Sequence, residues 1–361
     1  MASRTERHQP GIGELPASAI ALGAGVITLV LIYIGSRGLR DFDAALIGYA
    51  VGVVFAVIGL TYRYAMWISR PPTWRYFRAG WSNFFSWRRF KRYAVLVPKA
   101  WWTDIFAQTF IKERSTLRWV MHMCIFWGVV LSCMITIPLS LGWFHLTMAG
   151  ESPSDYTMWF FGITLFNFPL NTVLSFIVFH ALDFTAAILL VGVLIAFWRR
   201  FTDAGLLTTQ RFGFDLMPLV MLFGIAVTGI ALTFSSALWD GHFYWFISLT
   251  HEAIVVIWLL YLPFGKFFHI VERPATIGVT LYQQIASDED RASGFAGAAR
   301  CRRCGATMPS SQFIGDLLAT LDDLGQDYDL GDRGQLQEYC PTCKRILRGQ
   351  AYYGIMANRF L

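Results

Sequence analysis

Charged residues are scarce in this chain of 361 residues. Asp, Glu, Lys and Arg together make up 15% of it, whereas hydrophobic residues make up 55%. A soluble domain could not bury that much apolar surface, so the composition excludes an ordinary soluble protein and predicts one that lies in the lipid bilayer. The formal net charge of +6 is therefore interpreted by the position of the basic residues, and not as a sign of nucleic-acid binding.

Cysteine is also rare, with six residues. Two of them, Cys124 and Cys133, fall inside apolar runs, where small core residues are expected. The other four form two C-x-x-C pairs in the polar C-terminal part, an arrangement typical of a metal site and not of a disulfide framework. The first apolar stretch lacks the small-x-small cleavage site of a signal peptide, so we expect it to be retained.

Six apolar stretches are long enough to cross a membrane. They run over residues 17–36, 44–68, 117–143, 172–198, 213–237 and 244–270. We therefore expect an all-α polytopic membrane protein. Its parts are a cytoplasmic N-terminus (1–16), a six-helix transmembrane bundle (17–274), a flexible linker (275–299) and a small four-cysteine, zinc-ribbon-like metal-binding module (300–361).

Lysine and arginine are missing from the connections around "MAGESPSDY" and "SALWDGHFY", which we expect outside the cell. The connection 69–116 is rich in them, so it is expected in the cytoplasm. An even number of spans then places both termini in the cytoplasm, and the chain in a bacterial or archaeal cytoplasmic membrane. Within this connection, "KAWWTDIFAQTFIKE" (99–113) is interpreted as an interfacial amphipathic helix, with an ordinary loop as the alternative.

Four of the seven histidines lie inside the predicted spans, at two depths. His122 and His269 lie near the cytoplasmic side, and His180 and His251 lie nearer the outside. On one continuous helix, the eighteen positions from His251 to His269 are five turns and about 27 Å along one face. Pro263 and Gly265 are expected to bend that helix. A single membrane histidine is commonly a packing residue, but four polar side chains at such depth favour a functional site.

A haem b bound by two histidines needs two imidazoles at the same membrane depth on facing helices, and the four histidines form two such pairs. Such ligation closes both axial positions of the iron and suits electron transfer. We therefore predict two haem b groups, one held by His122 and His269 and one by His180 and His251. Zinc is disfavoured because two histidines per site are too few ligands, and a proton relay gives no reason for level pairs. One haem, or none, are the alternatives.

The sequence around these histidines resembles a known family. The span ending in "HIVERPA" and the stretch "LRWVMHMCIFWG" resemble the haem-bearing helices of the respiratory nitrate reductase gamma subunit. The membrane subunits of heterodisulfide reductase and of sulfite-reduction complexes share this plan, and the resemblance covers residues 110–275. It departs at Ser132, ten positions after His122, where that family has its other ligand. His180 would have to take that role, so nitrate reduction is not implied.

The resemblance implies a di-haem cytochrome b subunit of a quinone-linked respiratory oxidoreductase. Electrons would pass between membrane quinone and a cytoplasmic iron–sulfur oxidoreductase subunit. Arg118, Arg211 and Lys266 are candidates for holding haem propionates, or are positive-inside anchors. Asp183, one turn after His180, is a candidate to take a quinol proton or to fix the His180 tautomer, with a packing role as the alternative.

The C-terminal cysteines lie in "CRRCG" and "CPTCK" and are Cys301, Cys304, Cys340 and Cys343. Four thiolates favour structural Zn²⁺. Iron is one alternative, because the two pairs resemble rubredoxin knuckles, and the absence of any metal is another. The stretch "FIGDLLATLDDLG" between the pairs is interpreted as an inserted helix. A membrane transporter or a zinc-module sensor without haem remain alternative functions, although the broken helices and repeats of transporters are not visible in the sequence.

Overall fold

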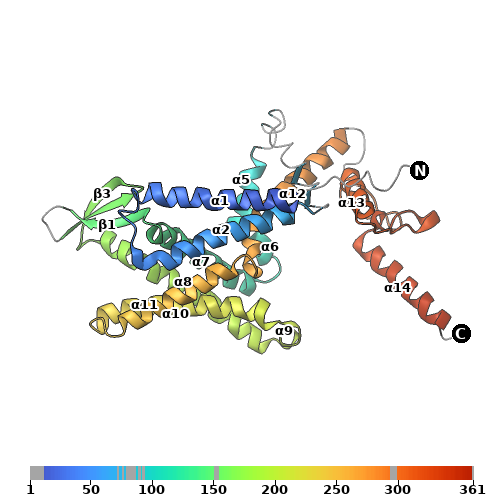
Figure 1. Ribbon diagram of the computed structural model, residues 1–361. Coiled ribbons are helices and arrows are strands. Elements are labelled where there is room, and N and C mark those ends of the chain that lie inside the picture. The colour runs from blue at the N-terminus through green and yellow to red at the C-terminus, as the bar shows by residue number, and fades with distance from the viewer. Residues whose placement is uncertain are drawn as a thin grey trace. The chain divides into compact units, whose positions relative to one another are not determined.

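Figure 1 shows the computed structural model of the chain. The structure describes residues 12–70, 73–74, 77–78, 87, 91, 94–149, 154–292 and 299–359. The expectations for residues 1–11, for most of 71–93 and for 293–298 lie outside the described residues. The chain divides into two compact units. The bundle unit comprises Glu14–Tyr64 and Thr103–Glu272, and the module unit comprises Met1–Gly13, Ala65–Trp102 and Arg273–Leu361.

Among the described residues, six helices are long and apolar enough to cross a membrane. They are α1 (Glu14–Gly35), α2 (Ile47–Ile68), α7 (Thr116–Ser140), α8 (Val173–Thr202), α10 (Met217–Leu238) and α11 (Tyr244–Tyr261). The short helical segment Ala44–Leu46 precedes α2, and the segment Phe212–Leu216 precedes α10. The six-span prediction is therefore confirmed, and the chain is a multi-pass membrane protein.

Close packing between α7 and α8 depends on glycine. A Cβ added to Gly128 of α7 would lie 2.7 Å from Cβ of Leu189, and one added to Gly192 of α8 would lie 2.8 Å from the backbone N of Ile125. Small residues let membrane helices approach in this way, because lipid offers no hydrophobic force to drive larger side chains together. In turn α8 also packs against α10, and α10 packs against α11.

Leucine at position 128 is therefore expected to force α7 and α8 apart. Overpacking of this kind costs about 1–3 kcal/mol, and more where a backbone must move. The effect is measured by thermal unfolding in detergent, which is monitored as the loss of monodisperse protein. Gly23→Leu is the matched control, because a Cβ at Gly23 would meet no atom of the described residues within 4 Å. Equal midpoints for the two variants would contradict this account of the crossing.

The connection between α7 and α8 forms a three-stranded antiparallel sheet that the sequence analysis did not predict. Its strands are β1 (Phe144–Met148), β2 (Asp155–Phe160) and β3 (Ile163–Pro169), in the order β1-β2-β3. Phe161 and Gly162 make the two-residue turn between β2 and β3, with φ of 51° and 73°. Positive φ at both positions matches the twist of a tight hairpin.

Two helix predictions need correction. The stretch 99–113 is not one helix, because α5 (Leu96–Ala100) leads into a π-helical turn (Trp101–Phe106), and α6 (Thr109–Lys112) follows a break at Gln108 with φ of 48°. The linker prediction is wrong for residues 275–292, which belong to α12 (His269–Ala292). The physical reason is an apolar stripe at helical spacing, in which Ile277, Leu281 and Tyr282 are buried.

The module unit has a small core around its cysteines. α13 (Ser311–Asp323) confirms the inserted helix, and α14 (Pro341–Arg359) begins directly after Cys340. Met308, Ile314 and Tyr339 pack with three of the cysteines. The hydroxyl of Tyr282 on α12 donates to the carboxylate of Asp316 on α13, so the part of α12 that follows Glu272 belongs to the folded part of this unit.

Candidate functional site

The structure brings His122 and His269 together. The centres of their rings lie 6.5 Å apart, with an angle of 64° between the ring planes. A metal–imidazole bond is about 2 Å long, so two such bonds in line, with the ring nitrogens about 1 Å from the ring centres, place the ring centres about 6 Å apart. The spacing of this pair would therefore suit two imidazole ligands of one metal ion.

His269 reaches this position because the chain turns after α11. The continuous helix predicted over 244–270 is wrong: α11 ends at Tyr261, a 3₁₀ turn covers Lys266–Phe268, and His269 begins α12. Pro263 cannot donate to a helical hydrogen bond and favours such an end. His251 and His269 thus do not share one helix face, although they lie at the two ends of the same connected segment.

A hydrogen bond of His269 sets the tautomer of its ring. Its Nδ1 lies 2.6 Å from the carbonyl oxygen of Lys266. A carbonyl oxygen only accepts, so Nδ1 carries the hydrogen and Nε2 keeps its lone pair. Metal-bound histidines are commonly oriented by a backbone carbonyl in this way.

Arg63 holds the turn that carries His269, and the sequence analysis missed it. Its guanidinium donates to the carbonyl of Pro263 and lies over the ring of Phe268, 4.1 Å from the ring centre. Gly59, one turn earlier on α2, allows this approach, because a Cβ there would lie 2.6 Å from the Pro263 side chain. An arginine inside an otherwise apolar span was the signal that could have found it.

The three basic residues predicted to bind propionates differ in their surroundings. The Nζ of Lys266 forms an ion pair with Asp215 at 2.8 Å. The backbone N–H of Arg211 donates to the other oxygen of Asp215 at 3.0 Å. The backbone N–H of Arg118 donates to the N-cap hydroxyl of Ser115. A propionate at Lys266 would therefore compete with Asp215 for the ammonium group.

His180 takes part in a hydrogen-bond chain. Its Nδ1 lies 2.9 Å from Oδ2 of Asp183, and Oδ1 of Asp183 accepts from the hydroxyl of Thr233 on α10 at 2.8 Å. Asp183 thus contacts His180 as a residue that fixes its tautomer would, and that role stays a prediction.

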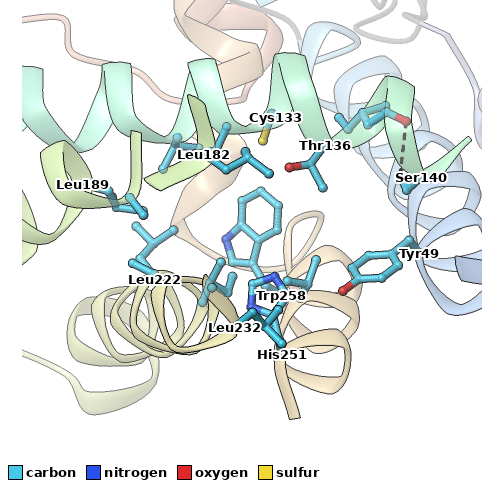
Figure 2. A pocket seen from close by; sticks show the side chains of 18 of the residues that line it. Tyr49, Cys133, Thr136, Ser140, Leu182, Leu189, Leu222, Leu232, His251 and Trp258 are labelled. Atoms are coloured by element: carbon cyan, nitrogen blue, oxygen red, sulfur yellow. Dashed lines mark hydrogen bonds between the residues drawn. The ribbon is translucent and has the colours of Figure 1, made fainter. Parts of the chain in front are cut away.

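His251 lies at the wall of a cavity of about 280 Å³ between α2, α7, α8, α10 and α11 (Figure 2). Asp183, Tyr49 and Trp258 also line it, among mainly apolar side chains. His180 is not among the lining residues. The pairing of His180 with His251 on one haem therefore stays a prediction.

The four C-terminal cysteines form the second site. The sulfur atoms of Cys301, Cys304, Cys340 and Cys343 all lie within 4.8 Å of one another, and this confirms that the two pairs form one cluster able to hold a metal ion. Three of the four are buried. Thiolate sulfurs at this spacing fit a tetrahedral site.

Hydrogen bonds make part of this cluster acidic. The backbone N–H of Cys340 donates to Sγ of Cys301 at 3.2 Å and is the main cause of the lowering of the Cys301 pKa to about 6. Burial and the neighbouring sulfurs raise the pKa of Cys343 to about 12. Four thiolates together therefore need a cation to offset their mutual repulsion.

Comparisons of the chain with protein-family models, with curated proteins and with solved structures find no match. The function must therefore be argued from the two sites themselves.

Proposed function

We propose that this protein is a haem b subunit of a quinone-linked respiratory complex. It would pass electrons between membrane quinone and a cytoplasmic iron–sulfur partner. The observation that carries the proposal is the 6.5 Å separation of the His122 and His269 rings inside a membrane bundle. A haem held by His122 and His269 would supply one-electron transfer and would not bind oxygen.

The chain's own residues fit this role. His122 on α7 and His269 at the start of α12 approach from two different elements, and the Lys266 carbonyl fixes the His269 tautomer. Arg63 and Gly59 hold the supporting turn. The resemblance to the nitrate reductase gamma subunit supports quinone as the membrane substrate, and the basic connection 69–116 supports a cytoplasmic partner.

The experiment that tests the proposal is a dithionite-reduced minus oxidised visible spectrum of the purified protein, with haem quantified per chain. At least one haem b per chain is expected after expression with adequate haem supply. Absence of haem would leave a transporter or a zinc-module sensor as the better explanations of the bundle and the cysteine cluster.

Arg63→Ala is expected to weaken haem binding about tenfold while the bundle stays folded. Removing a residue that orients a metal ligand typically costs 10–100-fold in affinity, and here it frees the turn before His269. Haem titration of the apoprotein measures the effect. Arg70→Ala, at an exposed position two residues after the end of α2, is the control. Arg63→Lys should restore only part of the affinity because lysine lacks the planar guanidinium. Equal affinities for the two alanine variants would remove Arg63 from this role.

A further inference from the structure

The ring of His251, at the wall of the cavity, has a defined tautomer and offers a hydrogen-bond acceptor. The hydroxyl of Thr228 donates to the carbonyl oxygen of Gly224 at 2.6 Å, so its oxygen accepts from Nδ1–H of His251 at 2.8 Å. Nε2 of His251 then keeps its lone pair. The ring lies against α10 at Gly229, where an added Cβ would be in ordinary van der Waals contact with Cε1 of His251, at 3.4 Å.

The same cavity contains a buried donor. The side chain of Trp258 lies across it in Figure 2, and the residue is 7% exposed. Its indole Nε1 is buried without a hydrogen-bond partner among the described residues. Leaving such a group unpaired costs about 1–3 kcal/mol, so the cavity favours a ligand that brings an oxygen acceptor.

The walls do not fit a second bis-histidine haem. His251 is the one imidazole among the lining residues that the structure describes. Ser132, at the position of the missing family ligand, lines the cavity and shares a hydrogen bond with Thr185 at 2.8 Å. His180 is held by Asp183, which Thr233 holds in turn.

We infer that this cavity binds the head group of a quinone or quinol in place of a second haem. The choice of quinone rests on the function proposed above. The cavity volume of about 280 Å³ lies near the lower end of small-molecule sites, about 300–1,000 Å³, and suits a quinone ring better than a porphyrin. Trp258 donates to an oxygen of either redox form, whereas His251 accepts the O–H that only the quinol has.

Equilibrium binding of radiolabelled menadione to the full-length protein in lipid nanodiscs tests the inference. It is measured without reductant for the quinone, and with excess dithionite for the quinol. Trp258→Phe is expected to weaken both forms about fivefold, the effect of about one hydrogen bond. His251→Phe is expected to weaken the quinol at least tenfold and the quinone less. Trp245→Phe, on the same helix and 75% exposed, should change neither.

Haem content, measured on the same samples, separates this inference from the proposed function. Unchanged haem in His251→Phe supports the inference. Loss of one haem per chain in that variant would overturn it, because His251 would then be an axial ligand. Equal affinities for Trp258→Phe and Trp245→Phe, or no menadione binding to the unaltered protein, would also overturn it. A protein that lacks haem, yet binds menadione with the expected variant pattern, would instead refute the proposed function and leave the cavity assignment standing.

Discussion

The variants His122→Gly and His269→Gly are expected to contain at least tenfold less haem than the unaltered protein. Each removes one of the two imidazoles that we propose as haem ligands, whose rings lie 6.5 Å apart. Loss of residues that merely orient a ligand already costs 10–100-fold in metal affinity, so loss of the ligand itself should cost no less. Haem per chain and the reduced-minus-oxidised spectrum measure the change.

Added imidazole separates a missing ligand from a misfolded bundle. Glycine leaves space for a free imidazole molecule, which should restore the spectrum in both variants if the helices are in place. His242→Gly is the control, because His242 is exposed and its Nδ1 bonds to the nearby carbonyl of Trp239. Full haem content in either His122→Gly or His269→Gly would show that the pair does not bind it.

The parts of the fold that composition determines were predictable. Length and hydropathy place six spans, because a bilayer demands about twenty apolar residues per helix. The depth argument placed His122 and His269 at one level, and their rings do lie 6.5 Å apart, although the argument assumed a continuous helix up to His269. Where Pro263 and Gly265 were expected to bend the helix, they end it, and the choice depends on tertiary contacts such as that of Arg63 with Pro263.

Other features left weaker signals. The strands 144–148, 155–160 and 163–169 are apolar on both faces in places, so their alternation was hidden between two spans. Trp258 looks like any of the 14 tryptophans in the sequence. Only the packing around it shows that its N–H is buried without an acceptor in the described part of the chain. The His180–His251 pairing rested on depth alone, and depth does not say which way a side chain faces around its helix.

Cys301→Ser and Cys340→Ser are expected to abolish metal binding by the C-terminal module and to unfold it. Binding of structural zinc by such sites is worth about 10–16 kcal/mol at neutral pH and is largely folding free energy. The core of the module is small and built around the cysteines themselves, so little else would hold α13 and α14 in place. One metal ion per chain is expected in the unaltered protein, and none in either variant, by elemental analysis after purification without chelators.

Limited proteolysis shows whether the module unfolds, and Cys124→Ser is the matched control because Cys124 lies on α7, outside the cluster. Colourless protein with one zinc per chain would assign Zn²⁺, whereas visible sulfur-to-iron charge-transfer bands would assign iron and extend the electron path beyond the bundle. If the unaltered protein carries no metal and its six thiols all react freely, the cluster is not a metal site. Retained haem in Cys301→Ser and Cys340→Ser would show that the two sites fold independently, since His122 and His269 lie in the bundle unit and the cysteines in the module unit.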